Sequence, residues 1–302
     1  MRSSETGHTA AAFDHDVVVI GGGPAGCAAG VFTARYGLDT LVFDRGRSSI
    51  RRCAYLENYL GFPAGIDIET LYGLIHDHAE QAGCEIVADL VESLERAEDR
   101  QGFRVRTQDG DRVTARRVIA ATRYDGEYMR GLDDETAMFE TFEYDGEERE
   151  HFDKSYAERD GTTPVDGLFV ASPYGETGYQ ASMAAGRGTR VGITVVEAVR
   201  RERGYPDPLA NHYDWMRRAA ELDDERSDRE QLGERFDERL PDDHDLEAAR
   251  LAELREREVD RRLATHLSAD EIERRTERGQ KRLLEHIDDD LIRQAAREIE
   301  GE

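Results

Sequence analysis

The chain has 302 residues, which is enough for one large domain or two modest ones and for a buried core. Its 66 acidic and 41 basic side chains give a formal net charge of -25, which argues against nucleic acid as a partner because phosphate binding needs clustered cations. All basic residues except Lys154 and Lys281 are arginine, and we interpret this acidic, lysine-poor composition as halophilic, typical of a cytoplasm with molar salt.

The first part of the chain alternates apolar runs with glycine and polar turns. Residues 16–20 form a continuous apolar run, which predicts a strand buried on both faces of a parallel sheet. A glycine-rich segment then leads into a helix predicted from Pro24 to Tyr36, and residues 39–43 form the next strand. This order of elements predicts a doubly wound, Rossmann-like α/β fold.

Farther along the chain the apolar pattern changes. Residues 103–107 and 112–115 alternate like half-solvated antiparallel strands, which predicts a meander, and residues 117–122 return to a buried strand. Residues 125–163 are acidic, dotted with aromatic side chains and weakly periodic, so we interpret them as a linker. A last apolar strand, residues 167–172, precedes an Ala/Gly-rich helix.

The end of the chain, residues 207–302, changes to Glu, Asp, Arg and Leu at helical spacing. Ser268 and Glu271 have the spacing of a capping box, which predicts that Ser268 accepts from the backbone and that Glu271 reaches back. Three apolar residues fall on one helix face at i, i+4 and i+8, namely Leu283, Ile287 and Leu291. We interpret this part as a charged α-helical extension that packs on the domain or on its copy, so we expect a homo-oligomer. A specific partner-binding module is the alternative.

Several classes of protein and site are not indicated by the sequence. The three cysteines form no CxxC or metal-type spacing, so we expect neither a disulfide framework nor a metal site. The polar start, residues 1–13, lacks the apolar stretch of a signal peptide, and no apolar run approaches the ~20 residues of a membrane span. We therefore expect a soluble, cytoplasmic protein with no membrane partner.

The glycine-rich segment has the spacing of a dinucleotide-binding motif between a predicted strand and a predicted helix. Gly21 permits a tight turn, Gly23 lets the backbone approach a pyrophosphate, and Gly26 allows the helix to pack closely on the sheet. The helix start, which includes Pro24 and Ala25, offers free N–H groups and the positive end of the helix dipole to the phosphates.

Asp44 closes the second predicted strand, where it is placed to accept hydrogen bonds from the adenosine ribose hydroxyls. An acid at this position disfavours the 2′-phosphate of NADP, and we include the following Arg45 among the cofactor-binding residues. The alternative is a plain glycine-rich turn, but the strand, the helix and the terminal acid together favour a dinucleotide site. This motif alone does not distinguish FAD from NAD.

Four segments in chain order resemble the thioredoxin reductase-like family of pyridine nucleotide-disulfide flavoenzymes. They are residues 20–26 for the first FAD motif, 57–63 for the ENYPGFP segment, 117–122 for the strand normally ending in ATG, and 160–163 with 165–171 for the second FAD motif. Residues 179–181 and 184–186 also resemble the start of the family's last helix. The resemblance implies FAD as the cofactor, with further contacts from Asn58, Thr122, Tyr179, Gln180 and Ala181.

The resemblance covers residues 14–204, which we expect to form an FAD-binding domain with a parallel sheet and an antiparallel meander, followed by the extension 207–302. In the family, an NADPH domain that carries a redox CxxC lies before the second FAD motif. Here residues 125–163 take its place, without GxGxxG or CxxC, so the sequence indicates a truncated form. ATG has also become ATR at Arg123, and Pro173 replaces the acid that binds the ribityl chain.

Cys53 lies just before the ENY segment, and flanking Arg51 and Arg52 favour its thiolate, which makes it a candidate catalytic residue. A buried spectator thiol is the alternative. Our leading hypothesis is an FAD-dependent oxidoreductase that uses external NAD(P)H or a protein redox partner as electron donor. The other hypotheses are a non-catalytic FAD-binding scaffold or redox sensor whose helical tail mediates assembly, and an NAD-binding protein.

Overall fold

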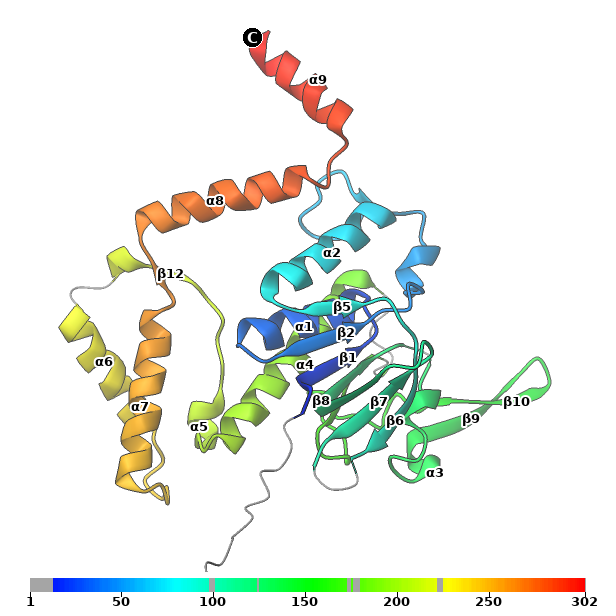
Figure 1. Ribbon diagram of the computed structural model, residues 1–302, viewed down its shortest axis with the longest axis horizontal. Coiled ribbons are helices and arrows are strands. Elements are labelled where there is room, and N and C mark those ends of the chain that lie inside the picture. Colours follow the sequence, from blue (N-terminus) through cyan, green and yellow to red (C-terminus); the bar gives the residue numbers. More distant parts are fainter. Residues whose placement is uncertain are drawn as a thin grey trace, which may run out of the picture. The chain divides into compact units, whose positions relative to one another are not determined.

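The structure is a computed structural model that describes residues 13–97, 101–123, 125–172, 175, 180–221 and 225–301 (Figure 1). Two compact units divide within one long helix, the first ending at Val195 and the second beginning at Val196. The domain boundary predicted near residue 206 follows the end of that helix and stays a prediction.

The first unit is built on a seven-stranded sheet, which confirms the predicted doubly wound α/β fold with its meander. The parallel part has the order β5-β2-β1-β8-β11, comprising Glu85–Val87, Thr40–Phe43, His15–Ile20, Arg112–Ala121 and Leu168–Ser172. The antiparallel part adds β7 (Phe103–Thr107) and β6 (Val91–Arg96) to β8. Val17, Val18 and Val19 in β1 are fully buried, because both faces of a central parallel strand are covered.

Strand β8 joins two strands that the sequence pattern separates. Its first half pairs with β7, from Arg106↔Arg112 to Phe103↔Ala115, while its second half pairs with β11 from Leu168↔Val118 onward. Strand β1 lies along both halves. The change from alternating to continuous apolar character therefore marks a change of neighbours within one strand rather than a break between two.

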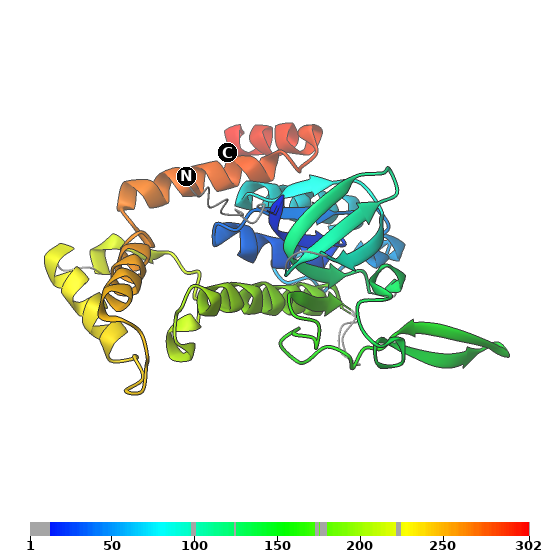
Figure 2. The same ribbon diagram turned by 60° about the horizontal axis from the view of Figure 1, so that its bottom comes forward.

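Three helices accompany the sheet: α1 (Pro24–Arg35), α2 (Ile68–Ala82) and α4 (Ala181–Glu202). Helices α1 and α4 pack backbone to backbone (Figure 2). A Cβ atom on Gly188 would lie 1.9 Å from the Ala25 carbonyl oxygen, and one on Gly192 would lie 2.7 Å from that of Ala29. The Ala/Gly-rich sequence of α4 thus allows this close approach to the helix that follows the glycine motif.

The segment predicted as a weakly periodic linker is structured in its described residues. It contains η2 (Glu127–Met129), α3 (Glu135–Met138) and a hairpin of β9 (Phe139–Tyr144) with β10 (Glu147–Phe152). Figure 1 shows this hairpin extending from the sheet. Tyr128, Phe139 and Phe152 are buried in the main core beside β1 and β7, so aromatic side chains anchor the segment on the domain. Short elements complete the unit: η1 (Ser49–Arg52), β3 (Tyr55–Leu56) and β4 (Ile66–Asp67).

The second unit begins with the end of α4 and is mainly helical. Its other elements are α5 (Asp207–Ala210), β12 (Arg217–Arg218), η3 (Ala219–Glu221), α6 (Glu225–Asp237), α7 (Ala248–Leu263), β13 (His266–Leu267), α8 (Ala269–Leu284) and α9 (Asp289–Glu300). A small core forms around Tyr205, Leu209, Phe236 and Leu254. None of the helices in the described part of the chain has the length and apolar character that a membrane span requires.

Two predictions for the helical extension need correction. Ser268 caps α8 by accepting from the N–H of Glu271 at 3.2 Å, but the Glu271 carboxylate binds arginines along the helix instead of reaching back. The run of Leu283, Ile287 and Leu291 does not share one helix face. Helix α8 ends at Leu284 and Asp288 caps a new helix, because its carboxylate accepts from the backbone N–H groups that begin α9.

Candidate functional site

A cleft opens at the carboxyl ends of β1, β2, β8 and β11, the edge at which doubly wound sheets bind ligands. Its walls include residues 20–25 at the end of β1, 43–45 and 47–50 at the end of β2, and 121–123 at the end of β8. The empty volume is about 1130 Å³ when the open mouth is included. All its lining residues belong to the first unit.

The glycine motif forms the floor of this cleft through three different constraints. Gly21 has φ +114°, and a Cβ there would lie 2.5 Å from the Ala121 carbonyl oxygen. A Cβ on Gly26 would lie 1.7 Å from the Gly21 carbonyl oxygen, so α1 can begin only with glycine at this position. At Gly23 a Cβ would meet only the Ser48 side chain within 4 Å, which leaves the backbone open to the cleft.

Helix α1 begins at this open backbone. Gly23 is its N-cap and makes no side-chain capping bond, and Pro24 occupies the first turn. The N–H groups of Ala25 and Gly26 have no partner within the helix, since an α-helix leaves its first donors unsatisfied. These donors and the helix dipole suit an anion beside the glycine turn.

The carboxylate of Asp44 is 7% exposed and is held by a network that the sequence analysis missed. Its Oδ2 accepts from the Tyr72 hydroxyl at 2.5 Å, and its Oδ1 accepts from the Gly46 N–H at 3.0 Å. His76 Nε2 lies 2.8 Å from the Gly22 carbonyl oxygen and 3.4 Å from Asp44 Oδ2. Because a carbonyl only accepts, His76 donates from Nε2 and ties the glycine turn to the acid.

Helix α2 supplies both Tyr72 and His76, which lie four residues apart on one helix face. Burial and the hydrogen bond to Asp44 raise the pKa of Tyr72 well above its ordinary value, so its hydroxyl stays a donor. The guanidinium of Arg51 lies 4.1 Å from the centre of the Tyr72 ring. The i, i+4 spacing was the available signal, but nothing in the sequence says that this face meets Asp44.

Residues that the resemblance selected come together from distant parts of the chain. The Asn58 amide donates to Gln180 Oε1 at 3.0 Å. Arg45 Nη1 donates to Asp125 Oδ2 at 2.8 Å, and the Thr122 hydroxyl donates to the Asp125 carbonyl oxygen. Of these residues, Arg45, Thr122, Asp125 and Gln180 line the cleft, together with Ala181. The predicted Tyr179, like Pro173, lies outside the described residues.

Arg123 occupies the position where the resemblance leads one to expect glycine. Its φ is +66°, a conformation that non-glycine residues adopt infrequently. Its guanidinium donates to the Ser49 hydroxyl at 2.8 Å, which links the end of β8 to η1. Arg47 and Arg52 also line the cleft, so several positively charged side chains gather here although the chain as a whole is strongly acidic.

Asp89 brings a negatively charged, buried hydrogen-bond acceptor to the same cleft. It lines the cleft beyond β5 and is 8% exposed. Its Oδ1 accepts from the Leu90 N–H at 2.6 Å, while its buried Oδ2 has no hydrogen-bond partner among the described residues. A ligand donor, or water, would satisfy this oxygen, since a buried polar atom without a partner is costly.

The three cysteines occupy different environments. Cys53 follows η1 and is exposed, and it is not among the lining residues of the cleft in the described part of the chain. Cys27 is buried in α1 and donates to the Gly22 carbonyl oxygen at 3.2 Å; burial and the Asp44 charge raise the pKa of its thiol. Burial also raises the pKa of Cys84 to about 12. Within the described residues, no group of three or more His, Cys, Asp and Glu is arranged to hold a metal ion.

The residues present fit an adenine dinucleotide. The glycine turn leaves its backbone open beside unsatisfied helix N–H groups, and the buried carboxylate of Asp44 lies at the end of the neighbouring strand β2. The N–H groups can donate to a pyrophosphate, and the carboxylate can accept from ribose hydroxyls. Among the described residues of the cleft, Arg123 departs from the family pattern, because its side chain stands where the family's glycine would leave space.

Comparisons with known proteins relate the first part of the chain to one family. Residues 15–131 match the family described as pyridine nucleotide-disulphide oxidoreductase. Over 110 residues the chain is 32% identical to thioredoxin reductase from Aquifex aeolicus, covering 36% of this chain and 33% of the relative. It is 34% identical over 110 residues to thioredoxin reductase from Bacillus subtilis, covering 35% and 33%. The chain thus spans about a third of the length of the curated relatives it matches.

Two solved structures share the fold. One is a thioredoxin reductase from Gloeobacter violaceus, with a TM-score of 0.51 and 17% identity, covering 67% of this chain and 98% of that chain. The other is a putative thioredoxin reductase from Bacillus anthracis, with a TM-score of 0.50 and 14% identity, covering 63% and 99%. At these identities the likeness concerns the fold alone.

Proposed function

Because this chain belongs to the thioredoxin reductase-like, FAD-binding pyridine nucleotide-disulphide oxidoreductases, we propose that its first unit holds FAD in the cleft at the ends of β1, β2, β8 and β11. The observation that carries the proposal is the link between the glycine turn and Asp44. His76 joins the Gly22 carbonyl to the buried carboxylate, so the pyrophosphate and ribose positions are fixed relative to each other before a ligand arrives.

Each part of the cleft has a role in this proposal. The N–H groups of Ala25 and Gly26 would bind the pyrophosphate, and Asp44 Oδ1 would accept from the adenosine ribose. Thr122, Asn58 and the Gln180–Ala181 start of α4 would border the flavin end. When bound, FAD supplies the hydride and electron transfer, while these residues orient it and tune its charge.

We propose that electrons come from freely diffusing NAD(P)H or from a protein donor. The described part of residues 125–163 forms a core-anchored segment and a hairpin, which leaves no second doubly wound domain for a nicotinamide nucleotide there. The proposal does not include thioredoxin reduction, since the sequence has no CxxC. Cys53 remains a candidate for a thiol step, and its exposure keeps it accessible to a partner.

A non-catalytic FAD-binding scaffold or sensor is the second candidate, and Arg123 favours it. Its hydrogen bond to Ser49 holds a guanidinium in the wall of the cleft. A guanidinium so placed would hold the anionic cofactor in the cleft without itself supplying a group that moves a proton.

The experiment that tests the proposal has two stages. The protein is purified in high salt and denatured, and the released ligand is identified by its visible spectrum and mass; we expect FAD. Steady-state oxidation of NADH and NADPH with a generic electron acceptor then separates the two candidates, because a scaffold holds FAD without turnover. Release of NAD alone, or failure to retain FAD after reconstitution, contradicts both.

A further inference from the structure

The second unit has a cleft of its own, which lies outside the residues of the family match, 15–131. It lies where the segment after α5 runs beside α7, and β12 pairs with β13 at one side. Two aromatic rings, Tyr213 and Trp215, line it with Thr265 and four arginines. No carboxylate belongs to its lining in the described part of the chain.

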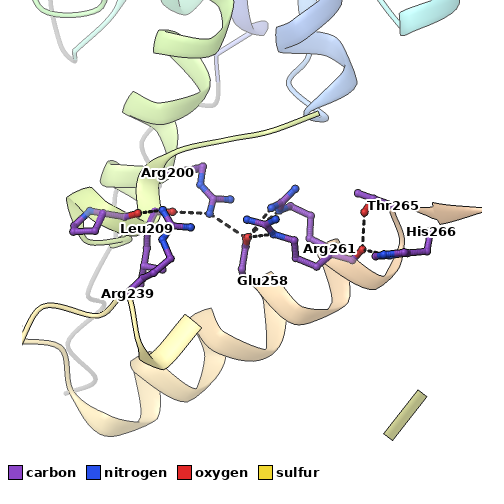
Figure 3. Close-up of polar contacts among 9 residues, drawn as sticks. Arg200, Leu209, Arg239, Glu258, Arg261, Thr265 and His266 are labelled. Atoms are coloured by element: carbon purple, nitrogen blue, oxygen red, sulfur yellow. Dashed lines mark hydrogen bonds and ion pairs between the residues drawn. The ribbon is translucent and has the colours of Figure 1, made fainter. Parts of the chain in front are cut away.

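A single buried carboxylate fixes two of these arginines. Glu258 on α7 is 8% exposed, and it accepts from Arg261 Nε and Nη2 at 2.9 and 2.6 Å and from Arg262 Nε at 3.0 Å. Arg200, which is 1% exposed, donates to the same carboxylate at 3.0 Å (Figure 3). One carboxylate therefore pairs with three guanidinium groups, so this cluster of four side chains carries a net positive charge.

The arginines keep donors for a ligand. Arg262 bonds to Glu258 through Nε, and Arg261 through Nε and Nη2, so three of their Nη donors have no hydrogen-bond partner among the described residues. Arg239 is positioned separately, because one of its Nη groups donates to the Pro208 carbonyl oxygen. Guanidinium groups that are already oriented lose less entropy when they bind an anion.

The aromatic rings are exposed beside these cations. Trp215 is 71% exposed and Tyr213 is 58% exposed, although large aromatic side chains ordinarily bury most of their surface. A planar ring stacked on Trp215 would remove this apolar surface from water. Its edge could accept hydrogen bonds from the arginines, and its face could stack on a guanidinium. An inorganic anion would leave the rings unused, and a neutral ring would leave the arginines unused.

We propose that this cleft binds a nucleotide, with the phosphates on Arg239, Arg261 and Arg262 and the base on Trp215. A nucleic acid chain is a poorer occupant, because the net charge of -25 repels an extended polyanion beyond the reach of this local cluster. The proposal is independent of the FAD site, whose residues all belong to the first unit.

The test uses a built-in reporter, since Trp215 is the one tryptophan in the sequence. The full chain, both FAD-loaded and freed of FAD, is titrated with ADP while tryptophan fluorescence is followed. We expect a saturable change in emission with ADP. Adenosine and inorganic pyrophosphate, each carrying half of the recognition, should need about tenfold higher concentration or more, as loss of one charge-assisted hydrogen bond alone would predict.

Variants locate the response. Arg239→Gln and Arg262→Gln should each weaken ADP binding by about tenfold, since each removes a charged donor. Arg239 makes no hydrogen bond to Glu258, so the Arg239→Gln variant still tests the proposal if Arg262→Gln fails to fold. The matched control is Arg274→Gln, an exposed arginine on α8, which should leave the titration unchanged. Gly23→Val, which blocks the FAD cleft, should respond to ADP as the FAD-free wild-type chain does.

Three outcomes overturn the proposal. The first is no saturable change with ADP. The second is an equal response in wild type and in both cleft variants, which means that another region binds ADP. The third is a response that only the FAD-free wild-type chain gives, and that bound FAD or Gly23→Val abolishes without loss of the fold. ADP then enters the FAD cleft, so the proposed FAD site stands while the second site does not.

Discussion

His76 shows how a side chain outside any motif can position one inside it. Through Nε2 it contacts the Gly22 carbonyl and lies near the Asp44 carboxylate, so it couples the glycine turn to the acid at the end of β2. Tyr72 completes the support, since its hydroxyl donates to the same carboxylate oxygen. A buried acid with two fixed donors keeps its remaining lone pairs aimed at a ligand.

Replacing His76 should therefore weaken FAD retention without removing any expected ligand contact. We expect His76→Ala to lose about tenfold in FAD affinity, the equivalent of one hydrogen bond of about 1.4 kcal/mol. FAD fluorescence after dialysis against graded FAD concentrations measures this. His78→Ala is the matched control, because His78 lies on the same helix α2 and has no contact with the glycine turn or Asp44 among the interactions observed. Equal losses in both variants would contradict the role given to His76.

Substitutions within the motif should follow a definite order. Gly23→Val places branched carbons at the backbone that must approach the pyrophosphate, so FAD retention should be lost almost completely. Asp44→Ala removes ribose hydrogen bonds worth roughly 1.5–3 kcal/mol, about ten- to a hundredfold in affinity. Cys53→Ser should retain FAD, since Cys53 is outside the cleft lining in the described residues.

The control for this series is Gly279→Val, because a Cβ at Gly279 meets nothing within 4 Å. Flavin absorbance per folded chain, checked by circular dichroism, gives the order. Full occupancy in a folded Gly23→Val variant would place the nucleotide elsewhere.

Local chemistry explains which site residues could be predicted from the sequence. Gly21, Gly23, Gly26 and Asp44 follow from a strand, a turn and a helix that are contiguous or nearly so, and their roles come from backbone geometry. The contacts of Arg45 with Asp125 and of Asn58 with Gln180 depend on folding that no local pattern encodes. The same is true of His76, and these residues remain proposals as ligand contacts.

The hairpin of β9 and β10 shows a similar limit for whole elements. Its strands alternate, with Phe139 and Phe152 buried at their base, but the many acidic residues between them hide the period. Asp145 and Gly146 both have positive φ, as a two-residue hairpin turn requires, so the Asp-Gly pair was a usable signal. The central strands were predicted more easily, because a buried parallel strand is apolar throughout.

The arginine cluster around buried Glu258 of α7 gives the clearest stability prediction for an element. Glu258→Gln should destabilise the second unit by about 3–5 kcal/mol, since it leaves Arg200 buried without a full counter-charge. Urea unfolding followed through Trp215 measures this. Glu271→Gln is the control, because Glu271 pairs with exposed arginines on α8, and such pairs contribute about 0–1 kcal/mol. A loss for Glu258→Gln as small as that of the control would contradict the structure of this cluster.

The same cluster should make the second unit sensitive to acid. Burial alone would raise the pKa of Glu258, but the hydrogen bonds and charges of Arg261 and Arg200 outweigh it and lower that pKa to about 2. Burial and the charges of Arg261 and Arg200 lower the pKa of His212 to about 4. Both groups bind protons more readily when unfolded, so their contribution is complete above the unfolded histidine value of about 6.5 and falls as the pH drops towards 2.

Unfolding free energies measured by Trp215 fluorescence from neutral pH downward should therefore decrease in two stages, histidine first. Glu258→Gln should reduce the decrease below about pH 4.5 and retain the earlier one, because Glu258 is the carboxylate of this cluster and its pKa is lowered to about 2. Stability that rises on acidification would show that the sign of these shifts is wrong. Unfolding of the first unit, followed through flavin fluorescence, distinguishes the two units.

The charge of the whole chain leads to the last prediction. Its net charge of -25 makes the folded state repel itself, most strongly in dilute buffer, whereas molar salt shortens the screening length to about 3 Å. Salt also weakens the exposed Arg–Glu pairs along α7 and α8, but each contributes only about 0–1 kcal/mol. Because the uncompensated charges outweigh these pairs, the melting temperature should rise between dilute buffer and molar KCl.

A local variant tests whether repulsion between acids is the cause. Glu143 and Glu148 face each other across the β9–β10 hairpin, a like-charge arrangement that destabilises a strand pair. Replacing both with glutamine should raise the melting temperature in dilute buffer more than in molar KCl, since salt already screens the repulsion in wild type. Replacing the paired Glu277 with glutamine is the control and should not raise it, because it removes an attraction to Lys281. A wild-type melting temperature that is flat or falls with salt would refute the interpretation of the acidic composition as an adaptation to salt.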